Sequence, residues 1–170
     1  VPVLLSTRDH GILSPVHPTI ADFNYMIVMV TSGNQKIFLD ATEPELAVGL
    51  VPMRCLNGKG ISIVPGLPDE IEIRNPASAS FTSVFLEMKD GKFSGKLSVR
   101  NTGLSAFNFR QDLKKEGSEK DHFEKFKEKA EGVEFLNFSY LNIDSLNLPV
   151  ERKYDITLPN QDSESTVIYI

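Results

Sequence analysis

A single cysteine and three histidines are the side chains of this 170-residue chain best suited to nucleophilic or metal chemistry: Cys55, His10, His17 and His122. A catalytic thiolate needs a nearby base and a lowered pKa. Cys55 lies in the segment 53–58, whose residue types are typical of a strand end that runs into a turn. We therefore expect this thiol to be structural.

The three histidines lack the spacing of a zinc-binding motif, because no His-x-x-x-His or His-x-x-Glu-His sequence occurs. His10 falls in a turn and His17 in a proline-containing loop, whereas His122 is expected on the solvated side of an amphipathic helix. One cysteine also rules out an internal disulfide and any Cys₄ metal site. We predict no metal site and no cofactor.

The clearest local structure signal is a β-hairpin. Two β-rich runs, 23–30 and 36–42, flank the turn residues Ser32-Gly33-Asn34-Gln35. A Gly-Asn pair between such runs favours a tight hairpin. The simplest register has a two-residue loop made of Gly33 and Asn34.

Asp40 stands out in this hairpin because it interrupts an apolar run, where a carboxylate needs a partner. In the simplest register Asp40 faces Ile27 and lies diagonal to Tyr25, so the two polar side chains can meet on one sheet face. Alternatively, Asp40 begins a turn and binds the backbone N–H groups of Thr42 or Glu43. The sequence leaves both interpretations open.

Two regions are expected to carry these residues. Residues 1–65 are β-rich, and Pro65-Gly66-Leu67-Pro68 is the best boundary, since an interior strand cannot continue through it. Residues 69–170 predict an α+β unit with the order β-β-α-α-β-β. Its expected elements are strands 81–88 and 93–101 around an Asp90-Gly91 tip, helices 105–115 and 119–131, and strands 133–143 and 150–158, with a further strand at 166–170.

The composition of the chain argues against two classes of protein, those that bind nucleic acid and those that span a membrane. The chain is 41% hydrophobic and 24% charged, with a net charge of −5 and a pI near 5.2. An acidic chain of this kind is not expected to bind nucleic acid, and no apolar run approaches the roughly 18–20 residues that span a membrane. Because strand-like residues begin and end the chain, we expect it to be a piece of a longer protein whose targeting signals lie elsewhere.

Several segments are similar to a known family. The first region carries the relevant motifs in Pro2–Gly11, Phe23–Tyr25, Leu39–Thr42 and Pro52–Gly58, and the second in Gly91–Gly95, Gly103–Ala106 with Arg110, and Leu148–Val150 before Tyr154. Together they resemble the C-terminal part of bacterial multidomain transglutaminase-like proteins of the papain fold. The resemblance implies the β half of a transglutaminase-like core over 1–65 and a C-terminal domain of unknown function over 69–170.

The resemblance also implies site residues. The family core uses a Cys–His–Asp triad, in which Asp40 matches the aspartate. The histidine position holds Tyr25, and tyrosine, with an ordinary pKa of about 10, is no base at neutral pH. The family's cysteine would lie before residue 1, and Cys55 does not match it. His10 or His17 would replace the base only if their loop folded back.

These observations favour a non-catalytic fragment that serves as a binding or accessory module of an exported or periplasmic, envelope-associated protein. Its expected partners are the upstream half of the parent, or a protein, peptide or envelope glycan. The alternative is part of an active cysteine protease or transglutaminase, and a third hypothesis is an adhesion or scaffolding module. The hairpin face that a missing helix would cover should be apolar and exposed, which predicts a homodimer through that face or pairing of edge strands.

Overall fold

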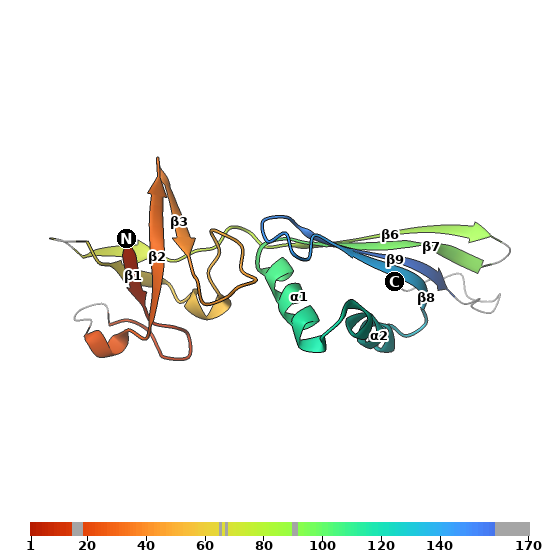
Figure 1. Cartoon of the computed structure of the whole chain (residues 1–170), viewed down its shortest axis with the longest axis horizontal. Helices are drawn as coiled ribbons and strands as arrows, with labels where there is room; N and C mark the ends of the chain where they lie inside the picture. The colour runs from red at the N-terminus through yellow and green to blue at the C-terminus, as the bar shows by residue number, and fades with distance from the viewer. Residues whose placement is uncertain (15–18, 65, 67, 90–91, 159–170) are drawn as a thin grey trace. The chain divides into compact units, whose positions relative to one another are not determined.

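The structure is a computed structural model that describes residues 1–14, 19–64, 66, 68–89 and 92–158. The described residues form two compact units (Figure 1). Unit 1 comprises Val1–Ala79 with Thr102–Phe107, and unit 2 comprises Ser80–Asn101 with the described residues from Asn108 onward. No helix among the described residues is long and apolar enough to cross a membrane.

Unit 1 is built on a five-stranded antiparallel sheet with the strand order β3-β2-β1-β4-β5. Two short 3₁₀ helices, η1 (Ile20–Asp22) and η2 (Met53–Cys55), lie in its connections. The strands are β1 (Pro2–Leu5), β2 (Tyr25–Ser32), β3 (Gln35–Leu39), β4 (Lys59–Ser62) and β5 (Asp69–Glu72).

The hairpin β2–β3 has the expected register. Ser32 pairs with Gln35 and Val28 with Leu39, which leaves Gly33 and Asn34 as a two-residue loop. Gly33 adopts a φ of 57°, a conformation that glycine reaches without the steric cost a side chain would add. This part of the prediction is confirmed.

The two faces of this sheet differ in exposure. One face packs into the core of unit 1, which consists of Val3, Leu5, Ile27, Met29, Phe38, Val51, Cys55, Ile71 and Ile73. On the other face of β2, Met26, Val28 and Val30 keep 58%, 42% and 43% of their surface exposed. We call these three side chains the open apolar face. Its exposure agrees with the apolar, exposed hairpin face that was expected from the resemblance.

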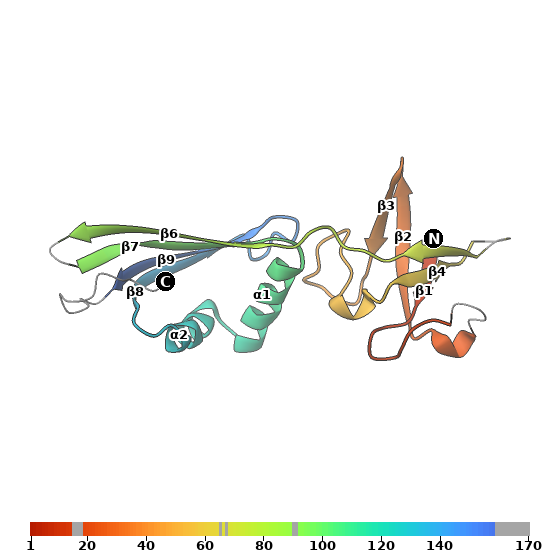
Figure 2. The same ribbon diagram turned by 180° about the vertical axis from the view of Figure 1, so that it is seen from behind.

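Unit 2 has the predicted order β-β-α-α-β-β around a four-stranded antiparallel sheet, β6-β7-β9-β8. Figures 1 and 2 show both helices on one side of that sheet. The elements are β6 (Ser80–Lys89), β7 (Lys92–Asn101), α1 (Gly103–Glu116), α2 (Glu119–Lys129), β8 (Glu134–Leu141) and β9 (Val150–Leu158). The start of α1, up to Phe107, belongs to unit 1. The predicted fold class, α+β, is confirmed.

Local sequence explains how these helices are held. Ser118 caps α2 by accepting a hydrogen bond from the backbone N–H of Asp121 at 3.1 Å. Phe123 of α2 stacks on Phe138 of β8, with ring centroids 4.2 Å apart. One face of α1 is apolar and buried, where Phe109 and Leu113 keep only 6% and 8% of their surface exposed.

Arg110 on the same face of α1 is 4% exposed, and burial lowers its pKa. Its guanidinium donates four hydrogen bonds of 2.7–3.1 Å to backbone carbonyls of the β8–β9 connection, at Asn142, Ile143, Ser145 and Leu148. A buried arginine is tolerated when its donors are satisfied in this way. Arg110 therefore fixes the path of that connection.

The division of the chain differs from the expected boundary at 65–69. The units separate after Ala79, because β5 pairs with β4 and so belongs to unit 1. Lys59 and Gly60 lie within β4. A side chain at Gly60 would approach the Leu4 carbonyl oxygen to 2.8 Å, so the strand needs glycine there.

Three expectations fall outside the described residues: the strand at 166–170, the Asp90-Gly91 tip and Pro65 with Leu67 at the boundary.

Candidate functional site

Three elements of unit 1 bring the candidate site together. Tyr25 is the first residue of β2, and Asp40 directly follows β3. Thr42 and Glu43 lie in the turn after Asp40, and Arg54 lies in η2. The hairpin register brings the start of β2 beside the end of β3, so residues 15 positions apart meet.

Asp40 satisfies both interpretations that the sequence left open. The Tyr25 hydroxyl donates to Asp40 Oδ2 at 2.8 Å. The other carboxylate oxygen, Oδ1, accepts from the Thr42 backbone N–H at 2.9 Å and from its hydroxyl at 2.8 Å. Asp40 therefore begins a turn and also binds Tyr25, which answers the need of this carboxylate for partners.

Arg54 closes the cluster from the other side. Its Nη2 donates to the Tyr25 hydroxyl at 2.9 Å, and its guanidinium lies 5.2 Å from the centre of the Tyr25 ring. Its Nη1 forms an ion pair with Glu43 at 2.6 Å, and this carboxylate raises the pKa of Arg54. No local sequence pattern indicated this contact between Arg54 and Tyr25, which lie 29 residues apart.

The chemistry of this cluster is restricted by the phenol. Partial burial raises the pKa of Tyr25 above its ordinary value, so it stays protonated at neutral pH. Its single proton is donated to Asp40 while its oxygen accepts from Arg54. The arrangement links two strands and η2, and its protonated phenol cannot replace a histidine as a general base at neutral pH.

The surroundings of Cys55 disfavour a nucleophilic thiolate. It lies in the 3₁₀ helix η2, where a strand end was expected, and its side chain is 1% exposed in the core. Burial raises its pKa to about 11, and the nearby Arg54 offsets only part of that effect. Reactive thiols need the opposite, a lowered pKa and access to solvent.

Neither described histidine forms a hydrogen bond to this cluster. His10 Nε2 is 3.0 Å from the Ala21 carbonyl oxygen, so its ring is engaged by the backbone. His17 lies outside the described residues. Among the residues that the structure describes, no group of three histidine, cysteine or acidic side chains is placed to hold a metal ion.

His122 corrects a prediction. It was expected on a solvated helix face, but its Nδ1 lies 3.0 Å from the Tyr140 hydroxyl and its ring packs edge-on against Phe109. Burial lowers its pKa below the ordinary value. The aromatic residues of β8 and α1 cover this position, which the helical pattern of α2 alone did not indicate.

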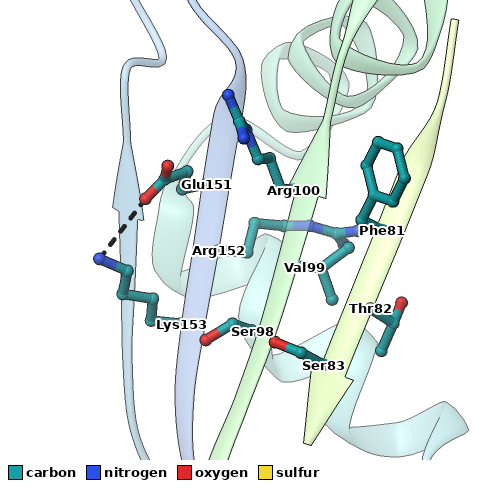
Figure 3. Close-up of a pocket in the computed structure, with 9 residues that line it drawn as sticks. All are labelled: Phe81, Thr82, Ser83, Ser98, Val99, Arg100, Glu151, Arg152 and Lys153. Carbon is teal, nitrogen blue, oxygen red and sulfur yellow. Dashed lines mark ion pairs between the residues drawn. The ribbon is translucent and has the colours of Figure 1, made fainter.

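A hollow of about 270 Å³ lies on the sheet of unit 2. Strand register sets its walls in two rows, Phe81–Arg100–Glu151 and Ser83–Ser98–Lys153. Because side chains alternate along a strand, both rows point away from the buried Val99. The two serines are too small to fill the space between the longer side chains, and Glu151 pairs with Lys153 at 3.4 Å (Figure 3).

Comparison with known proteins adds no assignment: no protein-family model, curated protein or solved structure matches this chain.

Proposed function

We propose that this chain is a non-catalytic binding or accessory module of an exported, envelope-associated transglutaminase-like protein. Its motifs support the family. The observation that carries the non-catalytic role is the state of its reactive groups: at the position of the family histidine, Tyr25 donates its proton to Asp40 and accepts a hydrogen bond from Arg54. The one thiol, Cys55, is buried with its pKa raised to about 11.

The test is thiol reactivity and acyl transfer in the full 170-residue chain. At pH 8 we expect slow labelling of Cys55 by an alkylating reagent, fast labelling after unfolding in guanidinium, and no incorporation of a fluorescent amine into glutamine-containing peptides. Cys55→Ala is the matched control for labelling. Amine incorporation or peptide hydrolysis that disappears in Cys55→Ala would overturn the proposal.

The open apolar face is the surface that we assign to a partner. Met26, Val28 and Val30 lie together on β2. Contiguous exposed apolar side chains mark interaction sites on proteins. We propose that a further segment of the same protein covers this face, as the helical half would in the family that the sequence resembles. The competing occupants of this face are a second copy of the chain, a peptide or an envelope glycan.

A longer version of the protein tests that assignment. Met26, Val28 and Val30 should lose solvent accessibility when the preceding segment is present, which hydrogen exchange or carbene footprinting of β2 measures. Equal footprinting of β2 in the long and short chains would exclude a covering segment. If labelling of β2 in the 170-residue chain falls as the protein concentration rises, a homodimer covers this face instead.

A catalytic role for the longer protein is the second candidate, and the contact between Tyr25 and Asp40 is what favours it, because the residue at the base position still touches the carboxylate. The test is thiol labelling of a longer chain that includes the family's cysteine, with Tyr25→His alongside. Strong labelling of the unmutated protein near pH 7 would favour an enzyme. Labelling only in Tyr25→His would favour the non-catalytic module.

A further inference from the structure

The edge strand β6 is exposed along its described length. Phe81, Phe85 and Met88 keep 61%, 64% and 67% of their surface exposed. All ten of its residues pair with β7 in one uninterrupted register, without a bulge or a proline. A long, regular edge with apolar side chains presents unpaired backbone groups and is a template for another strand.

The other sheet edges among the described residues carry protection that β6 lacks. In the same sheet, the register of β8 shifts between Phe135 and Asn137, and such an irregularity twists an edge away from pairing. In unit 1, β3 has five residues and β5 has four, of which three are acidic. Short and charged edges disfavour association. This contrast singles out β6.

The backbone of β6 shows which groups face outward. The Phe85 carbonyl oxygen lies against β7, so close to Gly95 that a Cβ there would come within 1.8 Å of it. Inward and outward pairs alternate along an antiparallel strand. The N–H and C=O groups of Val84 and Leu86 therefore point away from β7 and are available to a new strand.

We propose that β6 pairs antiparallel with β6 of a second copy of this chain, with Phe85 on the two-fold axis, to form one continuous eight-stranded sheet. In this register Val84 faces Leu86 of the second copy through their outward backbone groups, and Phe85 faces its own counterpart at a non-hydrogen-bonded position, where side chains approach most closely. A two-fold interface requires this kind of self-complementarity. Centring the pair on Val84 would instead set Phe81 against Glu87.

Charge complementarity supports the same register. Glu87 of the second copy falls opposite Ser83, at the edge of the hollow in Figure 3. The side chain of Arg100 in that hollow is exposed and forms no hydrogen bond or ion pair with the part of the chain that the structure describes. The Cα atom of Glu87 in the second copy and the Cα atom of Arg100 would be separated by two strand spacings and by two residues along the strand. This places them about 12 Å apart. Extended glutamate and arginine side chains span this distance across the small Ser83.

The first test measures the mass of the full chain by sedimentation velocity over a range of concentrations. We expect a reversible dimer that Phe85→Lys abolishes, because two lysines would then face each other on the axis. Leu136→Lys is the matched control, since Leu136 is equally exposed, at 63%, on the opposite edge of the same sheet. Val28→Lys controls for the open apolar face of unit 1, and both controls should remain dimeric.

The second test addresses the register. Arg100→Glu and Glu87→Arg should each weaken the dimer at least about fivefold, and the double variant should recover most of that loss, as expected for a coupled charge pair. Phe85→Cys should form an intermolecular disulfide in air, whereas Leu136→Cys should not. A monomer at all concentrations, dissociation by Val28→Lys but not by Phe85→Lys, or no rescue in the double variant would overturn the proposal.

Discussion

Tyr25 connects three elements of unit 1 through one hydroxyl group. It donates to Asp40 and accepts from Arg54, so its loss removes a hydrogen bond to a carboxylate and a bond from a guanidinium. We expect Tyr25→Phe to lower the free energy of unfolding by about 1–2 kcal/mol, because hydrogen bonds to charged groups contribute more than neutral ones. Urea unfolding followed by circular dichroism measures this.

A double-mutant cycle separates the hydrogen bond from other effects of the substitution. Tyr25→Phe combined with Asp40→Asn should be less destabilising than the sum of the two single variants. Additive effects would show that Tyr25 and Asp40 are energetically independent despite the 2.8 Å between their oxygens.

His122 makes the stability of unit 2 depend on pH. Its pKa is lowered in the folded state, chiefly by burial and secondarily by Arg152, relative to an ordinary value of 6.5. Below pH 6.5 the unfolded chain therefore binds a proton that the folded chain does not, and stability falls as the pH falls. Above that pH both states are neutral at this residue, and the effect vanishes.

We expect His122→Gln to reduce the loss of stability between pH 7 and pH 5, as measured by urea unfolding at each pH. His10→Gln is the comparison, because His10 lies in unit 1 and its ring nitrogen contacts only a backbone carbonyl among the described residues. An unchanged pH profile in His122→Gln would contradict the prediction.

At the scale of elements, the pairing of β6 with β7 depends on Gly95. A Cβ there would lie 1.8 Å from the Phe85 carbonyl oxygen, which is part of the backbone and cannot rotate away. We expect Gly95→Ala to destabilise unit 2 by about 1–3 kcal/mol, the usual cost of forcing extra atoms into a packed site. Thermal unfolding of Gly95→Ala beside Ser94→Ala provides the measurement, and equal stability of the two variants would refute it.

The connection between β8 and β9 depends on Arg110. Its guanidinium donates four hydrogen bonds to backbone carbonyls, and no other side chain among the described residues donates to these carbonyls. We expect Arg110→Met to cost about 3 kcal/mol, since a buried guanidinium and the four hydrogen bonds that it donates are lost. Arg100→Met is the control, because Arg100 is exposed, and its effect should stay within about 0.5 kcal/mol. Similar losses in chemical denaturation would argue against this role of Arg110.

At the scale of the whole molecule, charge and the open apolar face act in opposite directions. The net charge of −5 at pH 7 disappears near the pI of about 5.2. Because repulsion between molecules then falls, we expect light scattering to rise near this pH. Val28→Gln, which removes exposed apolar surface without changing charge, should reduce the scattering, whereas Thr31→Gln on the same strand should not. Equal scattering from both would exclude a contribution of the open apolar face.

Local patterns in the sequence determined much of this fold. The Gly33-Asn34 loop determined the hairpin register, and Ser118 determined the start of α2. The spacing of apolar residues determined the order β-β-α-α-β-β. Each of these features depends on neighbours within a few residues. The contact between Tyr25 and Asp40 was predictable for the same reason: one hairpin fixes it.

Only the tertiary structure decided the contacts between distant segments. Nothing near Arg54 indicates that it binds Tyr25, 29 residues away, and nothing near Arg110 indicates its bonds to carbonyls more than 30 residues later. The burial of His122 depends on Phe109 and Tyr140 from other elements, and the place of β5 depends on its pairing with β4. Local periodicity carries no information about such partners, because packing between elements chooses them.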